Sequence, residues 1–115
     1  MRIDPADSAF SKWIRNRDKV CQRCHKPSES LQCSHFYGRT MESVRFEPDN
    51  CDALCYGCHR YWEKEDREAY RAFKLKQLGQ ARFDSLILQA HTYHKKDRAF
   101  ELIRWKLALQ KQDEV

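Results

Sequence analysis

The sequence lacks any long apolar run, and it contains only three glycines and three prolines. No stretch approaches the roughly 18 apolar residues that a membrane-spanning helix needs, so we expect no membrane segment. The first seven residues show no apolar core of a secretory signal, and neither an internal repeat nor a low-complexity tract is evident. These absences favour a cytoplasmic protein in a reducing compartment.

Acidic residues are outnumbered by basic ones, 17 against 22, which gives a formal net charge of +5. A mildly basic chain suits a partner that carries phosphates, although many basic proteins never bind nucleic acid. The length of 115 residues and the hydrophobic content of 41% are typical of one domain with a modest core. We therefore expect residues 1–115 to form a single domain.

Hydrophobic spacing divides the chain into a loop-rich segment, residues 21–58, and helical segments around it. The predicted helices cover residues 7–18, 56–64, 67–78, 80–91 and 95–112, with Gly79 as a stop, and the strand candidates are 31–36 and 43–46. The predicted fold class is α+β and mostly α. A core at residues 7–64 precedes a helical extension at residues 65–115.

The last predicted helix has a wide apolar face that must be covered. Its two stripes are Phe100, Ile103 and Leu107, and beside them Leu102, Trp105 and Leu109. We expect this face to pack against Trp13, Phe73 and Phe83, because it is wider than a strict heptad seam. The alternative is that part of it forms a homodimer interface.

Four of the six cysteines form two Cys-x-x-Cys pairs, Cys21 with Cys24 and Cys55 with Cys58. Each pair can turn two thiolates toward one point, so together they predict a closed tetrahedral site for a structural Zn²⁺. A disulfide scaffold is the alternative for six cysteines in a small chain, but such scaffolds belong to oxidising compartments.

The other cysteines and three of the histidines have simpler interpretations. We interpret Cys33 and Cys51 as small core residues, because unpaired cysteines are among the most buried residue types. His25 follows a zinc-ligand candidate but competes with four better-spaced thiolates, so we expect it to be exposed. We also expect His91 and His94 to form a surface pair, because no acid or thiol accompanies them.

Three polar residues accompany the cysteine pairs: His35 in the string CSHFYGR, Asn50 in VRFEPDN and His59 in LCYGCH. These strings resemble the HNH endonuclease motif in its zinc-knuckle form, and they are similar to phage HNH proteins and NinG-type phage recombination proteins. The resemblance covers roughly residues 8–62. It implies a ββα-metal (HNH) core held by a structural zinc with four cysteine ligands, with an N-terminal helix and C-terminal helices packed around it.

The resemblance also implies a role for each of these residues: His35 is the general base, Asn50 holds the loop, and His59 holds a catalytic divalent ion. An imidazole titrates near neutral pH, so His35 can take a proton from the water that attacks phosphorus. A divalent ion, Mn²⁺, Mg²⁺, Co²⁺ or Ni²⁺, would neutralise charge on the phosphate and on the departing 3′ oxygen.

We therefore expect a metal-dependent DNA endonuclease that leaves 5′-phosphate and 3′-hydroxyl ends. The alternative is a zinc-containing DNA-binding or recombination-accessory module that does not cut. Arg39, Arg45, Arg60 and Lys64 are candidate phosphate contacts, and a solvated charged surface is the alternative for each. No element is typical of a recognition helix, so we expect weak sequence preference.

The sequence departs from the HNH pattern at one position. Many HNH motifs carry an acidic residue or a second His directly before the general base, and that residue joins the last His in holding the ion. Here the position is Ser34, a poor ligand. The ion would depend on His59, water and phosphate unless Asp49 or Asp52 completes the site. We expect Mg²⁺ to be the weakest activator and Ser34→Asp to raise activity in Mg²⁺.

Overall fold

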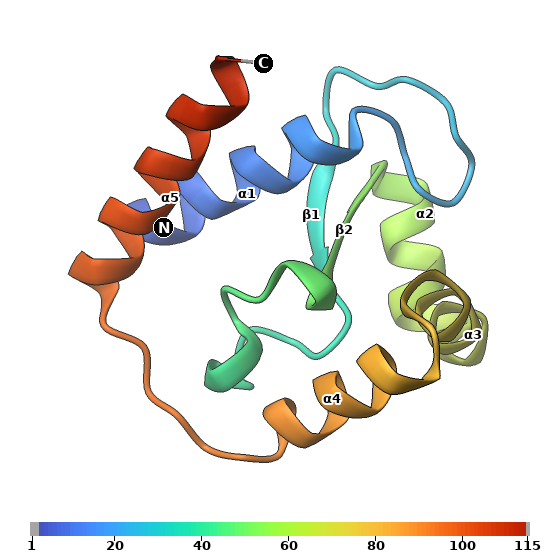
Figure 1. Ribbon diagram of the computed structural model, residues 1–115. Coiled ribbons are helices and arrows are strands. Elements are labelled where there is room, and N and C mark those ends of the chain that lie inside the picture. The colour runs from blue at the N-terminus through green and yellow to red at the C-terminus, as the bar shows by residue number, and fades with distance from the viewer. Residues whose placement is uncertain (1–2, 115) are drawn as a thin grey trace.

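The computed structural model describes residues 3–114, in which a helix and two strands precede four further helices (Figure 1). The elements are α1 (Pro5–Asp18), β1 (Gln32–His35), β2 (Cys51–Leu54), α2 (Tyr56–Arg60), α3 (Arg67–Leu78), α4 (Gln80–Ala90) and α5 (Arg98–Asp113). Short 3₁₀ turns cover Glu42–Val44 and Pro48–Asn50, and a π-helical turn, Tyr61–Glu65, follows α2. The prediction of a small α+β, mostly helical fold is confirmed.

Local sequence determines where the helices begin and end. The Asp4 carboxylate accepts the Ala6 N–H at the start of α1, and the Asp97 carboxylate caps α5 in the same way. This second cap begins the last helix at residue 98 rather than at the predicted residue 95. Gly79 has a φ of 81° between α3 and α4, which confirms its role as a glycine stop.

The two strands pair antiparallel, with Ser34 opposite Asp52 and His35 opposite Cys51. The first strand lies within its predicted range. The second strand prediction, residues 43–46, is wrong: this segment begins in a 3₁₀ turn, and the partner of β1 is β2. Residues 43–46 alternate between polar and apolar side chains, but their burial does not follow that pattern, since Ser43, Val44 and Phe46 are all buried. β2 is buried along its whole length, and its sequence shows no alternation.

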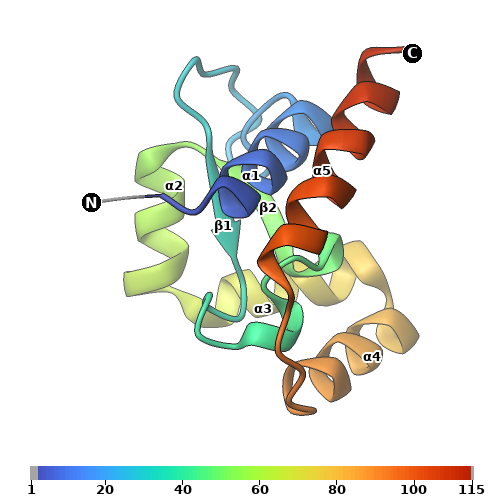
Figure 2. The ribbon, with the colours of Figure 1, turned by 90° about the vertical axis from the view of Figure 1, so that its left-hand side faces the viewer.

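The sheet separates two hydrophobic clusters. On one face α1 packs on both strands and α5 packs on α1, whereas α2, α3 and α4 lie on the other side (Figure 1). Figure 2 shows α5 running alongside α1, where the Trp105 ring lies 4.6 Å from Phe10 and 5.2 Å from Trp13 between centroids. The expected contact between the last helix and Trp13 is confirmed.

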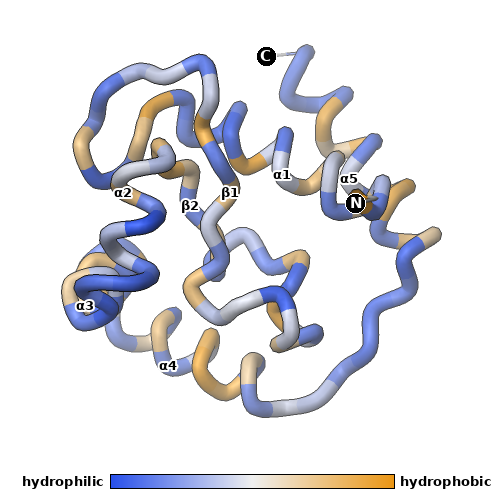
Figure 3. Tube along the Cα trace, turned by 180° about the vertical axis from the view of Figure 1, so that it is seen from behind, coloured by the Kyte–Doolittle hydropathy of each residue, from blue (hydrophilic) through white to orange (hydrophobic). Residues whose placement is uncertain are grey.

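The expected contact of the last helix with Phe73 and Phe83 is wrong, because both residues pack in the cluster of α2 to α4. The connection after α4 carries the chain around the molecule to α5, which packs on α1, and Figure 3 shows this connection as hydrophilic. Within α5, Phe100, Ile103 and Leu107 are exposed. A homodimer interface at this surface stays a prediction. No helix within residues 3–114 combines the length and apolar character needed to cross a membrane.

A polar network is sealed between the sheet and α3. The Lys74 and Asp52 side chains are both fully buried, and Lys74 Nζ lies 3.1 Å from Asp52 Oδ2. The Tyr70 hydroxyl donates to Asp52 at 3.1 Å and contacts Ser34 Oγ at 3.0 Å, and the Gln77 amide donates to Asp52 Oδ1 at 2.9 Å. Every oxygen of the buried carboxylate therefore has a donor, which offsets the cost of removing this ion pair from water.

Candidate active site and metal centre

The two Cys-x-x-Cys pairs meet in space. The sulfurs of Cys21, Cys24, Cys55 and Cys58 all lie within 4.8 Å of one another, and Cys24 Sγ and Cys55 Sγ are 4.0 Å apart. Four thiolates around a tetrahedral Zn²⁺ stand about 3.8 Å apart, because each Zn–S bond is about 2.3 Å. The donors therefore fit zinc in both type and spacing. The four-cysteine cluster can hold a structural metal ion, and it joins the loop before β1 to the start of α2.

The protonation of this cluster is uneven. Burial opposes ionisation of Cys21, but hydrogen bonds from the backbone of Cys24, Cys55 and Arg23 lower the pKa of its thiol to about 6. Burial raises the pKa of Cys58 to about 12, helped by the neighbouring thiols and opposed by the Arg23 guanidinium, which donates to Cys58 Sγ at 3.4 Å. Negative charge on one sulfur thus disfavours it on the next, and a divalent cation at the centre would remove that conflict.

His35 is held by a single backbone contact. Its Nε2 lies 2.9 Å from the Arg45 carbonyl oxygen. A carbonyl can only accept, so Nε2 carries the hydrogen and Nδ1 keeps its lone pair. Burial lowers the pKa of His35, and the hydrogen bond to Arg45 only partly opposes this shift. The ring is therefore neutral near pH 7, which is the state that can accept a proton or bind a metal.

Asn50 is fully buried and holds the loop between the strands. Its side-chain oxygen accepts the Tyr37 N–H at 2.9 Å, and its amide donates to the carbonyls of Tyr37 at 2.9 Å and Val44 at 3.1 Å. The loop end at Val44 is next to Arg45, whose carbonyl holds His35. Asn50 therefore holds the loop in place. It acts on His35 indirectly, because the loop backbone that it holds carries the Arg45 carbonyl.

His59 comes from α2, directly after the fourth cysteine. Its Nδ1 donates to the Gln32 side-chain oxygen at 2.8 Å, and its Nε2 lies 3.3 Å from Glu63 Oε2. Burial lowers the pKa of His59, with the Glu63 charge acting in the opposite direction. In the neutral ring Nε2 carries a lone pair, so two acceptors face each other across 3.3 Å. A cation between them would turn this repulsive contact into an attractive one.

One cleft of about 680 Å³ brings the two histidines together. His35, Arg39, His59 and Glu63 all line it, although they come from β1, the following loop, α2 and the π-helical turn. Asn50 does not line the cleft. An adjoining hollow beside His59 is lined by Arg60 and Lys64.

The four predicted phosphate contacts differ in their surroundings. Arg39, Arg60 and Lys64 are exposed. The Arg45 guanidinium instead pairs bidentately with the Asp7 carboxylate, and these hydrogen bonds raise the pKa of Arg45 above its usual value. Arg45 thus fastens the loop to α1 and has less freedom to meet a phosphate.

The acidic candidates that the sequence suggested beside Ser34 are elsewhere. Ser34 itself is buried on the opposite face of β1 from His35, where it meets the Tyr70 hydroxyl. Asp52 belongs to the sealed network, and Asp49 pairs with Arg82 on the surface. The expectation that Ser34→Asp would supply a ligand is therefore wrong, because strand alternation turns this side chain away from the cleft.

Comparison with known proteins adds one finding. The family model described as bacteriophage Lambda NinG protein matches residues 2–113. The chain belongs to the NinG family. No curated protein matches the chain, and no solved structure matches it either. The NinG match spans the cysteine cluster, the histidine cleft and the C-terminal helices alike.

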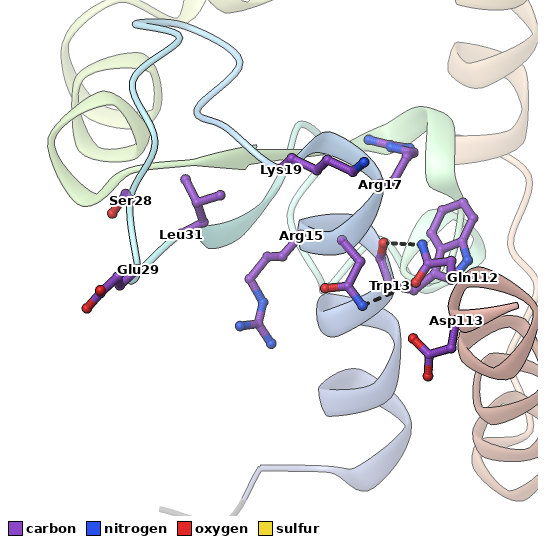
Figure 4. Close-up of a pocket in the computed structure, with 10 residues that line it drawn as sticks. Trp13, Arg15, Arg17, Lys19, Ser28, Glu29, Leu31, Gln112 and Asp113 are labelled. Carbon is purple, nitrogen blue, oxygen red and sulfur yellow. Dashed lines mark hydrogen bonds between the residues drawn. The ribbon is translucent and has the colours of Figure 1, made fainter. Parts of the chain in front are cut away.

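Three residues of this NinG-family site escaped sequence reasoning. Glu63 follows His59 by four positions on a helix, a spacing that brings side chains together and was available in the sequence. Gln32 meets His59 across elements, and no sequence pattern reveals that contact. Arg15 lines the histidine cleft and also a second cleft of about 840 Å³ between α1, the loop before β1 and the end of α5 (Figure 4).

The second cleft of this NinG-family protein is basic along its α1 wall. Arg15 and Arg17 of α1 and Lys19 directly after it line that wall, while Glu29 and Asp113 also line the cleft. Figure 4 shows Gln112 of α5 beside Trp13, whose carbonyl accepts its side-chain amide at 2.8 Å. The basic wall therefore continues from the histidine cleft toward the end of α5 through Arg15.

Proposed function

We propose that this NinG-family protein is a metal-dependent DNA endonuclease of phage recombination. The observation that carries the proposal is that His35 and His59 line one cleft, each with one ring nitrogen against an oxygen acceptor. A backbone carbonyl leaves His35 Nδ1 free, and Gln32 leaves His59 Nε2 free beside Glu63. One free nitrogen suits proton transfer, and the other suits a cation.

His35 then acts as the general base. Its Nδ1 takes a proton from water, and the resulting hydroxide attacks phosphorus while the bond to the 3′ oxygen breaks. His59 and Glu63 are the side chains that would hold a divalent ion, which when bound supplies charge neutralisation at the scissile phosphate and the leaving oxygen. Asn50 keeps the loop, and with it the Arg45 carbonyl, in the position that orients His35.

DNA would approach over the exposed basic residues at the rim. Arg39 lies in the cleft and Arg60 and Lys64 lie beside it, whereas Arg15 continues the basic path toward the second cleft. Arg and Lys contacts to phosphates position a strand without reading bases, so this arrangement predicts weak sequence preference and binding that weakens with salt.

A second candidate is a recombination-accessory module that binds DNA without cutting it. The four-cysteine cluster and the NinG family match fit this function equally well, since neither requires chemistry at His35. The single half-exposed carboxylate beside His59 also gives a catalytic ion few protein ligands. The two candidates share the DNA surface and differ only in hydrolysis.

The deciding experiment incubates plasmid DNA with the zinc-loaded protein and Mg²⁺, Mn²⁺, Co²⁺ or Ni²⁺. We expect nicked or linear product, and a loss of about 100-fold or more in His35→Ala with DNA affinity unchanged. His94→Ala, which changes an exposed histidine far from the cleft, is the matched control. Binding without product under every metal would favour the accessory module. Equal loss of binding and cutting in His35→Ala would make His35 a DNA contact.

A further inference from the structure

A second group of metal-ligand atoms lies outside the four-cysteine cluster. The thiols of Cys33 and Cys51 and a ring nitrogen of His35 all lie within 4.8 Å of one another. All three side chains project from the same face of the sheet, because Cys33 and His35 alternate along β1 and Cys51 is the cross-strand partner of His35. Both cysteines pack in the hydrophobic cluster of α1 and α5, as the sequence predicted, but core packing alone does not account for this convergence.

We propose that Cys33, His35 and Cys51 form a second metal site, selective for a soft divalent ion such as Zn²⁺ or Cd²⁺. Two sulfurs and one imidazole are ligands that soft ions prefer over Mg²⁺ or Mn²⁺. Three protein ligands leave a fourth position open, and Cys33 and His35 line the open cleft from which a water can complete a tetrahedron.

The histidine is already oriented for this role. Metal-binding histidines donate their second ring N–H to a carbonyl or carboxylate, and His35 Nε2 makes such a contact with the Arg45 carbonyl at 2.9 Å. Asn50 fixes the loop that carries that carbonyl. The imidazole of the site is therefore held in one orientation by the Arg45 carbonyl before any metal binds.

A disulfide is the competing use of the two thiols, and the register disfavours it. Cys51 is opposite His35, so Cys33 is its diagonal neighbour rather than its direct partner. Diagonal neighbours in an antiparallel pair stand about 7–8 Å apart, beyond the usual separation across a disulfide. Cys51 is also fully buried, which limits the access that thiol–disulfide exchange needs. A metal ion tolerates the wider spacing because it sits between the sulfurs.

Occupation of this site has a consequence that rests on the proposed function. The His35 nitrogen that would bind the soft ion is the one that would accept a proton from water, because the other is bonded to Arg45. A soft ion at Cys33, His35 and Cys51 therefore removes the general base. Zinc would support the protein at the four-cysteine cluster and inhibit it at the second site.

The binding test needs no nuclease activity. The reduced protein, loaded with one equivalent of Zn²⁺ for the four-cysteine cluster, is titrated with Co²⁺ while the thiolate-to-cobalt charge-transfer band is recorded. We expect one further equivalent in the wild type and no such band in Cys33→Ser, which changes a half-buried thiol. His35→Ala should keep a weaker, altered band, and His94→Ala should match the wild type.

Two results would overturn the site. One is a wild type that binds no thiolate-ligated Co²⁺ beyond the four-cysteine cluster. The other is a band of equal intensity in Cys33→Ser, which would place the cobalt in the four-cysteine cluster by exchange. If Cys33→Ser keeps the single zinc of the four-cysteine cluster and its melting transition, the variant is folded, and the lost band reports the second site.

The inhibition test separates the two proposals. In Mn²⁺-supported cleavage, Zn²⁺ should inhibit the wild type, and Cys33→Ser should need at least about tenfold more Zn²⁺ for the same inhibition. Equal zinc sensitivity would refute the link between the second site and the base. A protein that binds the additional Co²⁺ yet never cuts would refute the proposed nuclease and leave the second metal site standing.

Discussion

The two faces of the sheet are made from alternate residues of the same two strands, but one face carries a buried polar network and the other contributes residues to an open cleft. Toward α3, Ser34 and Asp52 join a sealed network with Lys74, in which every charged atom has a partner. Toward α1, Cys33 and His35 line an open cleft. Strand periodicity thus assigns one residue to stability and the next to the candidate site. Changes on the sealed face should affect folding, and changes on the open face should affect chemistry.

The largest effect on stability should come from the four-cysteine cluster, which joins the loop before β1 to the start of α2. Cys58→Ser removes a ligand of the four-cysteine site, and the loop-rich segment it joins has little apolar content, so we expect loss of zinc and of the cooperative melting transition. Zinc analysis and circular dichroism on heating measure this. Cys33→Ser is the matched control and should keep the zinc of the four-cysteine cluster and the melting transition. A Cys58→Ser protein with native zinc content would remove the cluster from its structural role.

On the sealed face, Lys74→Met should cost about 3–5 kcal/mol, because it leaves the Asp52 carboxylate buried without its cation. Denaturant unfolding gives this free energy. Lys76→Met, an exposed lysine of the same helix, is the control and should change little. Adding Asp52→Asn to Lys74→Met should recover part of the loss, and a Lys74→Met protein as stable as the wild type would contradict a sealed ion pair.

Behind the open face, Asn50→Ala should cost about 1–3 kcal/mol, because the Tyr37 and Val44 backbone groups lose buried partners. Cleavage should also fall, though less than in His35→Ala, since a misoriented base is slower but present. Unfolding curves and plasmid cleavage test the two effects. Asn16→Ala, an exposed asparagine, should show neither. A fall in cleavage without any loss of stability would place Asn50 in the chemistry itself.

The smallest effect on stability should come from the wall of the histidine cleft that α2 contributes. His59→Ala removes a partly exposed side chain bonded to Gln32 and Glu63, so the free energy of unfolding should change by less than about 1 kcal/mol. The structural zinc should remain, while Mn²⁺ uptake and cleavage are lost. Metal analysis and calorimetry with Mn²⁺ test this, with His25→Ala as control. Unchanged Mn²⁺ uptake would exclude His59 as a ligand.

The sequence predicted those parts of the molecule that local spacing determines. The two Cys-x-x-Cys pairs and the bounds of α3 depend on residues close in the chain, and both are found as expected. β2 was missed because a strand buried on both faces carries no alternation. Alternation along the predicted strand 31–36 already places Ser34 and His35 on opposite faces, but which helix covers each face is a tertiary fact.

The candidate site shows the same division. His35, Asn50 and His59 were predicted as site residues from the family resemblance of their strings, and the structure places both histidines in one cleft. Gln32 and Cys51 were not assigned to them, because each approaches a histidine across the sheet or from a separate element. The wide apolar face of α5 predicted that this helix is partly buried, but it did not predict that α1, and not Phe73 or Phe83, packs against it. A hydrophobic stripe carries no information about which surface covers it.

The pairing of α1 with α5 also sets an order of events during synthesis. About 80 residues separate these helices, so at about 5–20 residues per second several seconds pass before α5 can cover Trp13. During that interval α1 can already dock on the strands, because the Arg17 guanidinium donates to the Cys51 carbonyl at 2.8 Å and the Asp18 carboxylate accepts the Ala53 N–H at 2.9 Å. The nascent chain can therefore assemble its metal cluster and cleft first, and the last helix closes the molecule afterwards.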